Sequence, residues 1–275
     1  MKELFFKPEE DFKRIIYQHF SPDEITEINK IPTGWTNIVF EVNTKEDVFF
    51  FRFPRDNFWA KMMLKDYHFC EFIKGKTSFK TPDLKLCYDN ERPYSLHQKI
   101  EGTTLTEVID QMGAKESEKI AKGIIKFILE LKNIDVNLLP KECNYQLLDF
   151  LDELCKVHFD DLSLWHQEFF KNNNQNYIVH GDLNPGNVLV NDNYEVIGIL
   201  DFCFSGTGNP CSDIGWFISR SPNNFKVMLI KEYEKQAEQK IDNDILEGFI
   251  KAWLGIGEGY SNFIRKNNPD IVLPS

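Results

Sequence analysis

The strongest constraint on the fold is a change of sequence pattern close to residue 100. Before it, the runs IVFEVN at 38–43 and VFFFRF at 48–53 are rich in β-branched and aromatic residues, and a short polar segment separates them. Such a pair predicts a β-hairpin. From Leu105 onward, apolar residues recur at helical spacing through most of the chain. We therefore expect a small sheet-rich part, then a hinge at Glu101 and Gly102, then a larger helical part.

The remaining predicted elements follow the same division. Helices are expected at 8–20 and 58–74 in the first part, with extended stretches at 82–88 and 94–100. In the second part we expect helices at 105–112, 115–132, 144–156, 160–171 and within 211–266, interrupted by short strands at 187–190 and 195–200. With 275 residues, the chain is long enough for two lobes. The predicted fold class is α+β, with a small antiparallel-sheet N-terminal lobe at 1–100 and a larger, mostly helical C-terminal lobe at 101–275.

The charge of the chain is unevenly distributed. The formal net charge is −11, which argues against nucleic acid as a partner. Residues 1–100 carry 16 basic and 16 acidic side chains, so the whole acidic excess lies after residue 100. A solvated acidic surface explains this distribution, and so does an acidic cleft that concentrates a cationic substrate. The sequence leaves both explanations open.

Several classes of protein are excluded by what the sequence lacks. It has no run of 18 apolar residues, and its first residues are too acidic for a signal peptide, so we expect a cytoplasmic protein without a membrane partner. The six cysteines are scattered and form no C-x-x-C pair, which favours buried thiols over disulfides or zinc ligands. The six histidines form no H-E-x-x-H motif, so a zinc hydrolase finds no support.

The segment VHGDLNPGNVLV at 179–190 carries the strongest functional signal. It places Asp182 and Asn187 five positions apart on a loop shaped by glycine and proline, and the loop ends in a predicted strand. Fourteen residues after Asn187, the apolar run ILDF contains Asp201. Pairing of the two strands would bring Asn187 and Asp201 together. Two nearby oxygen ligands suit Mg²⁺, which takes one or two protein oxygens together with phosphate and water.

The combination H-G-D-x-x-x-x-N with a downstream I-x-D-F is more specific than either piece alone. It parallels the kinase pattern of a proton-accepting Asp, a metal-binding Asn and a metal-bridging Asp. With GNPCSDIGWF at 208–217 added, the chain resembles the aminoglycoside phosphotransferase family over roughly residues 30–220. This resemblance implies a protein-kinase-like bilobal fold and Mg²⁺-dependent transfer of the γ-phosphate of ATP or GTP to a hydroxyl. It also implies that Asp182 is the catalytic base and that Asn187 and Asp201 bind the metal.

The resemblance also implies nucleotide-binding residues in the first part. Arg52, in the strand FFFRFPRD, stands where most kinases carry a phosphate-holding Lys, and Asp66 is the best match to its acidic partner, with Glu71 second. Because Arg offers a planar fork, the exchange is not neutral. The segment 31–40 occupies the place of the glycine-rich loop, although an ordinary β-turn explains it nearly as well. Its candidate phosphate-binding residues are Gly34, Thr36 and Asn37.

Further expectations concern the hinge and the loops. Gln98 and Ile100 lie at the predicted hinge, where backbone groups would read the purine edge without choosing between ATP and GTP. The tripeptide at 75–77 (GKT) resembles the end of a Walker A loop, but Cys70 stands where its first glycine would be, so a P-loop enzyme is rejected. His180 is expected to hold the catalytic loop by hydrogen bonds, and Asp213 is expected to anchor it.

The acceptor is the least constrained part of the prediction. Family members that bind aminoglycosides, which are polycations, use acidic residues of the helical lobe, and Glu258 in GIGEGYSNF is the first candidate here. The other candidates are Asp149, Asp152, Glu153, Asp160, Asp161, Glu232, Glu234 and Glu238. Three functions stay open: an aminoglycoside O-phosphotransferase that inactivates the antibiotic, a kinase for a macrolide, choline, homoserine or methylthioribose, and an inactive kinase-like binding protein. Whether the chain is a monomer or a homodimer is also open.

Overall fold

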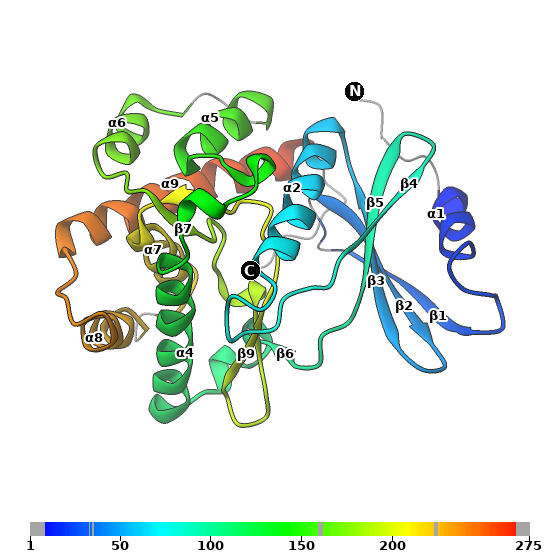
Figure 1. The fold of residues 1–275 in the computed structure, drawn as a ribbon, viewed down its shortest axis with the longest axis horizontal. Helices are drawn as coiled ribbons and strands as arrows, with labels where there is room; N and C mark the ends of the chain where they lie inside the picture. The colour runs from blue at the N-terminus through cyan, green and yellow to red at the C-terminus, as the bar shows by residue number, and fades with distance from the viewer. Residues whose placement is uncertain (1–8, 33, 35, 159–161, 223–224, 268–275) are drawn as a thin grey trace.

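The computed structural model describes residues 9–32, 34, 36–158, 162–222 and 225–267. A sheet-rich half lies beside a larger helical half, and the chain crosses between them after the last strand of the first sheet (Figure 1). The predicted α+β architecture, with an antiparallel sheet followed by a mostly helical part, is therefore confirmed.

The first sheet has five strands in the order β1-β2-β3-β5-β4, and all its neighbours are antiparallel. The predicted hairpin is β2 and β3, and the two predicted extended stretches are β4 and β5. Strand β1 was not predicted, because it lies at the sheet edge and its sequence ITEINKI has little apolar alternation. The bounds are β1 Ile25–Ile31, β2 Asn37–Thr44, β3 Val48–Pro54, β4 Lys85–Asp89 and β5 Arg92–Gln98.

Two helices cover opposite faces of this sheet. Helix α1 (Glu9–Ile16) packs on one face, where the Phe12 ring lies 5.2 Å from that of Phe40 and 4.8 Å from that of Phe53. Because side chains alternate along a strand, Arg52 of β3 points to the other face, toward helix α2 (Asn57–Ile73). Helix α2 begins at Asp56, whose side chain accepts a hydrogen bond from the Trp59 backbone N–H.

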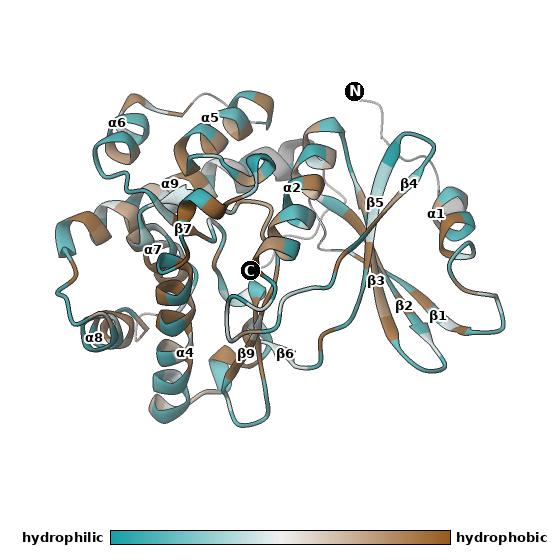
Figure 2. Ribbon diagram, viewed as in Figure 1, coloured by the Kyte–Doolittle hydropathy of each residue, from teal (hydrophilic) through white to brown (hydrophobic). Residues whose placement is uncertain are grey.

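Helix α4 (Ala114–Lys132) forms the centre of the helical half. Its buried apolar side chains share one core with Phe69 of α2 and Phe202, so α2 belongs to both halves. Figure 2 shows hydrophobic residues recurring among hydrophilic ones along α2 and α4. Among its described residues, the predicted region 211–266 contains three helices: α7 ends at Ser219, α8 spans Phe225–Ala237 and α9 begins at Asn243. The helices are α3 Leu105–Val108, α5 Leu147–His158, α6 Leu164–Asn172, α7 Pro210–Ser219, α8 Phe225–Ala237 and α9 Asn243–Asn267.

Two small sheets frame the loop that carries the sequence motif. Strands β8 (Val188–Val190) and β9 (Val196–Ile199) pair antiparallel as predicted, and β6 (Thr103–Thr104) joins β8. Strand β7 (Tyr177–Val179) enters the loop and pairs with β10 (Gly206–Gly208). The sequence did not predict β6, β7 or β10, because two or three residues are too few to show a period. The motif loop therefore runs from β7 to β8 with both ends fixed in sheets.

Within the described ranges, no helix is both long enough and apolar enough to cross a membrane.

Candidate active site

The motif loop is anchored by the buried Asp213 of α7. Its carboxylate accepts hydrogen bonds from the backbone N–H groups of His180 and Gly181, each at 2.8 Å. Burial raises the pKa of Asp213 to about 6, while the two donors act to lower it. Gly181 has φ +79°, and a Cβ there would lie 2.4 Å from the Phe204 carbonyl oxygen, so only glycine fits. The structure thus places Asp213 as a loop anchor, in line with the prediction.

His180 holds the other side of the loop in a defined tautomer. The Leu200 carbonyl, 3.0 Å from Nε2, can only accept, so Nε2 carries the proton. Nδ1 then accepts from the Asp182 backbone N–H at 3.1 Å. Burial lowers the pKa of His180 to about 4, and a second proton on Nδ1 would face the Asp182 N–H. His180 is therefore a neutral structural residue in the folded protein.

This arrangement predicts a loss of stability in mild acid. The unfolded chain protonates His180 near pH 6.5, whereas the folded protein does so only near pH 4. As the pH falls from 6.5 to 4, the unfolded state binds one more proton, so this residue alone lowers the free energy of unfolding by about 3 kcal/mol. Urea denaturation of the wild type and of His180→Gln across this range measures the contribution, because other histidines cancel in the comparison. Equal pH dependence in both proteins would contradict it.

Asp182 lies at the centre of the loop, half-buried, with three side-chain donors around its carboxylate. Asn187 Nδ2 donates to Oδ2 at 3.0 Å, and Asn184 Nδ2 donates to Oδ1 at 3.0 Å. Trp216 Nε1 donates to Oδ1 at 2.6 Å. Burial, and then the nearby charge of Asp201, raise the pKa of Asp182 to about 7, while these three donors oppose the rise. A carboxyl group with a pKa near neutrality suits a general base.

Asn187 and Asp201 are brought together by the pairing of β8 with β9, where the Leu200 N–H donates to the Asn187 carbonyl at 2.9 Å. The Asn187 amide nitrogen donates hydrogen bonds to Asp182. The side-chain oxygen of Asn187, Oδ1, is therefore the atom that can bind a cation. The Asp201 side chain is 32% exposed. Among the described residues no group of three or more His, Cys, Asp or Glu could hold a metal. Two oxygen ligands without such a cluster fit Mg²⁺, which keeps waters and phosphate oxygens, and do not fit zinc.

Arg52 and Asp66 form a buried ion pair that reaches the same centre. Arg52 Nη1 lies 2.5 Å from Asp66 Oδ2, and Nη2 lies 3.9 Å from Asp201 Oδ1. Asp66 Oδ1 accepts from the Phe202 backbone N–H at 2.9 Å. Burial disfavours the charged guanidinium and acts to lower the pKa of Arg52. The carboxylates of Asp66 and Asp201 have the larger combined effect, so the pKa of Arg52 is raised. The second candidate partner of Arg52, Glu71, is exposed, so Asp66 is the acidic residue that pairs with Arg52.

The candidate phosphate-loop residues lie at the turn between β1 and β2, where Thr33 and Trp35 are outside the described residues. The Gly34 carbonyl accepts from Nε and Nη2 of Arg55 at 3.1 and 2.6 Å, so the residue that follows β3 holds the turn in place. Asn37 Nδ2 donates to Thr36 Oγ1 at 2.9 Å. Asn37 is two positions before Val39, which pairs with Arg52, so the Asn37 and Arg52 side chains share a sheet face.

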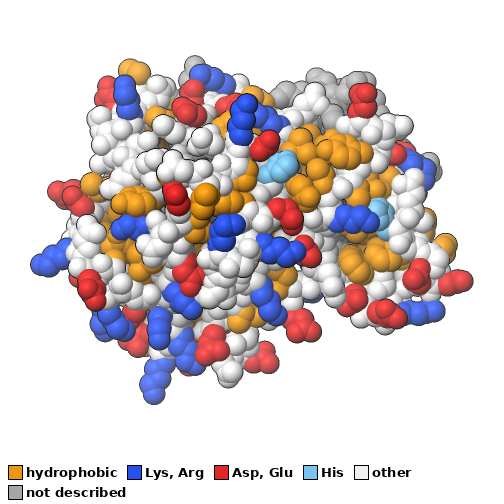
Figure 3. Space-filling view, viewed as in Figure 1, with side chains coloured by type: hydrophobic (Ala, Val, Ile, Leu, Met, Phe, Trp, Pro, Cys, Tyr) orange, Lys and Arg blue, Asp and Glu red, His pale blue; other side chains and the backbone are white. Residues whose placement is uncertain are grey.

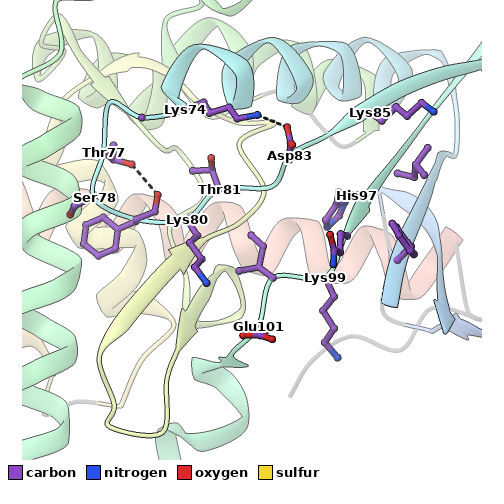
Figure 4. A pocket seen from close by; sticks show the side chains of 16 residues that line it. Lys74, Thr77, Ser78, Lys80, Thr81, Asp83, Lys85, His97, Lys99 and Glu101 are labelled. Carbon is purple, nitrogen blue, oxygen red and sulfur yellow. Dashed lines mark hydrogen bonds and ion pairs between the residues drawn. The ribbon is translucent and has the colours of Figure 1, made fainter. Parts of the chain in front are cut away.

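The predicted hinge follows β5 directly. The Gln98 side chain donates to Asp47 at 2.6 Å, and the Lys99 N–H donates to the Val48 carbonyl at 2.7 Å, so strand pairing ends at Lys99. Ile100 is the next residue, and it opens the linker to the helical half. A cavity of about 780 Å³ lies between this linker, β5 and residues 74–85, with Lys74, Lys80 and Lys99 on its walls (Figure 4). Asp182, Asp201 and Arg52 do not line it.

Several of the acidic candidates for acceptor binding form ion pairs with lysines. Glu153 pairs with Lys61 at 2.9 Å, and Glu232 pairs with Lys235 at 3.1 Å on α8. On the face shown in Figure 3, acidic and basic side chains are interspersed over the helical half. Asp160 and Asp161 lie outside the described residues. The candidates with exposed side chains are Asp149, Glu238 and Glu258.

Sequence reasoning missed three residues of this site. Asn184 lies inside the motif, and its spacing of two from Asp182 was a usable signal, because an amide at that distance can turn back onto the carboxylate. Trp216 and Arg220 come from α7 and its end. The Arg220 guanidinium carbon lies 4.4 Å from the centre of the Trp216 ring. Trp216 belongs to the sequence motif at 208–217, but nothing in the motif indicates its contact with Asp182, because that contact depends on how α7 packs against the loop.

The profile of the phosphotransferase enzyme family matches residues 27–249 of the chain. No curated protein sequence matches this chain. Several solved structures share the fold across nearly the whole length of both chains. One is APH(2″)-IIIa in complex with GDP and kanamycin, at 16% identity and a TM-score of 0.72, covering 95% of this chain and 98% of that one.

Two further structures with this fold have different acceptors in their names. The ADP-bound aminoglycoside phosphotransferase APH(2″)-Ib is 17% identical with a TM-score of 0.65, covering 96% of each chain. The macrolide 2′-phosphotransferase MphH from Brachybacterium faecium is 11% identical with a TM-score of 0.66, covering 95% of each chain. At these identities the likeness establishes the fold and leaves the acceptor open.

Proposed function

Because the chain belongs to the phosphotransferase enzyme family, we propose that it transfers the γ-phosphate of ATP or GTP to a hydroxyl of a small molecule. The observation that carries this proposal is the convergence of Asp182, Asn187, Asp201 and Arg52 on one centre. Structures that share the fold bind GDP or ADP, which supports a nucleotide as the phosphate donor.

Each residue at the centre has a distinct task in the proposed reaction. Asp182 accepts the proton of the acceptor hydroxyl as its oxygen attacks the γ-phosphorus. Arg52, fixed by Asp66, supplies a permanent positive charge beside the phosphates. Asn187 and Asp201 would hold Mg²⁺, which when bound neutralises charge on the phosphate oxygens. The fixed positions of these groups supply most of the rate enhancement expected for phosphoryl transfer.

We propose an aminoglycoside as the first acceptor to test. Proteins that share the fold have been crystallised with kanamycin, gentamicin and streptomycin. The acidic excess after residue 100 would attract such a polycation over a distance. A macrolide is the second candidate because a macrolide phosphotransferase has the same fold.

Nucleotide turnover against a panel of aminoglycosides, macrolides, choline, homoserine and methylthioribose tests both levels of the proposal. We expect Mg²⁺-dependent formation of nucleoside diphosphate and of a phosphorylated aminoglycoside, with EDTA abolishing both. Turnover with a macrolide or a metabolite, but with no aminoglycoside, would refute the proposed acceptor and support the proposed phosphoryl transfer. Nucleotide binding without transfer to any acceptor would instead favour a kinase-like binding protein.

A further inference from the structure

The indole of Trp216 makes the shortest side-chain hydrogen bond to the proposed base. Trp216 lies on α7, is 8% exposed, and donates its Nε1–H to Asp182 Oδ1 at 2.6 Å. The same oxygen accepts from Asn184 Nδ2 at 3.0 Å, whereas Oδ2 has one side-chain donor, Asn187 Nδ2 at 3.0 Å. The two carboxylate oxygens therefore differ in how many of their lone pairs are occupied.

A carboxylate oxygen has two in-plane lone pairs. At Oδ1 both are taken, by Trp216 and Asn184, and at Oδ2 one remains. We propose that Trp216 is a positioning residue for the base: it fixes the plane of the Asp182 carboxylate and, with Asn184, fills Oδ1, so that Oδ2 receives the proton. This inference rests on the proposed function.

The assignment defines the chemical step. The acceptor O–H bond breaks, its proton moves to Asp182 Oδ2, and the oxygen forms a bond to the γ-phosphorus. The bond between that phosphorus and the β–γ bridging oxygen breaks, and the nucleoside diphosphate leaves with the electron pair. Asn187 donates to Oδ2, so the proton arrives on the oxygen that lies beside the proposed metal ligands.

The indole is held in this position by its surroundings. The Arg220 guanidinium lies over the ring, with its carbon 4.4 Å from the ring centre. On α9, Gly257 leaves room for the stacked Arg220 and Trp216 side chains, because a Cβ at this position would lie 2.1 Å from Arg220 Nη2 and 3.7 Å from the Trp216 ring. The ring is thus packed between α7 and α9 with its N–H directed at Asp182.

A kinetic comparison of two Trp→Phe variants tests the proposal. Trp216→Phe keeps an aromatic ring and removes the N–H, so the carboxylate loses its fixed plane; we expect kcat to fall about 10-fold with an unchanged KM for the nucleotide. Trp253→Phe is the matched control, because its buried Nε1–H donates to the Ser212 carbonyl at 3.0 Å and not to the base. We expect its kcat to stay within about twofold of the wild type. Equal kcat for Trp216→Phe and wild type, or equal losses in both variants, would overturn the proposal.

A second measurement is independent of turnover. In protein labelled with ¹⁵N-tryptophan, the Trp216 indole N–H resonance, assigned through Trp216→Phe, should lie downfield and move upfield in Asp182→Ala, while the Trp253 resonance stays in place. A Trp216 resonance that is indifferent to Asp182→Ala overturns the hydrogen bond, and with it the proposal. Failure of the wild type to phosphorylate any hydroxyl would refute the proposed function, and with it the role of Asp182 as a base, whereas the resonance test decides the hydrogen bond separately.

Discussion

Asp182→Asn should lower kcat for phosphoryl transfer by about 10² to 10⁴-fold, the range for loss of a general base. The amide has the size of the carboxylate but cannot take the hydroxyl proton. It also brings an N–H₂ group toward Asn184, Asn187 and Trp216, which all donate to this position. Both of its orientations set donor against donor, because the N–H₂ meets Trp216 and Asn184 at the Oδ1 position or Asn187 at the Oδ2 position. We therefore expect a loss toward the larger end of this range. Steady-state kinetics with saturating nucleotide and acceptor measure the loss.

Two comparisons separate this effect from damage to the fold. Asp192→Asn makes the same chemical change in the exposed turn between β8 and β9, and should leave kcat unchanged. Asp182→Asn should still bind nucleotide, because Asp182 is not among the proposed nucleotide contacts. Activity of Asp182→Asn near that of the wild type would remove this residue from the mechanism. Loss of nucleotide binding together with activity would indicate a structural defect.

The pairing of β8 with β9 explains why the centre of the site was predictable. Once those strands pair, Asn187 and Asp201 flank one ladder and must approach each other. The loop between β7 and β8 is only a few residues long, so Asp182 has little choice of position. Arg52 and Asp66 were implied by the family resemblance, and the 2.5 Å contact between them follows from the packing of α2 on the sheet. Short-range pattern and spacing pointed to Asp182, Asn187 and Asp201, while the pair of Arg52 and Asp66 came from the resemblance.

The acceptor side was not predictable in the same way. Exposed acids such as Glu258 give no sequence signal that separates a binding site from a solvated helix face. Glu153 pairs with Lys61 of α2, and this contact depends on tertiary packing, whereas Glu232 pairs with Lys235 three positions along the same helix. Trp216 was read only as part of a motif, because its contact with Asp182 joins two segments 34 residues apart.

Asp66→Ala should lower the free energy of unfolding by about 3 to 5 kcal/mol, the cost of breaking a buried ion pair by removing one partner. The Asp66 side chain is 1% exposed and that of Arg52 is 11% exposed, so neither water nor salt screens the remaining charge. Asp66 Oδ1 also accepts from the Phe202 N–H, next to Asp201, and that donor would lose its partner. Arg52 would keep only the longer contact with Asp201 at 3.9 Å. Urea denaturation at neutral pH measures the change.

The same helix supplies an exposed pair for comparison. Lys74, just after α2, pairs with Asp83 at 2.7 Å, but their side chains are 59% and 76% exposed. Asp83→Ala should therefore cost no more than about 1 kcal/mol, although its ion pair is almost as short as the buried one. Adding Arg52→Met to Asp66→Ala should recover part of the lost stability, since it removes the unpaired buried charge. It should recover no activity, because the charge beside the phosphates is gone. Similar costs for Asp66→Ala and Asp83→Ala would show that burial does not set the strength of the Arg52–Asp66 pair, and would undercut its proposed role as the fixed support of the phosphate site.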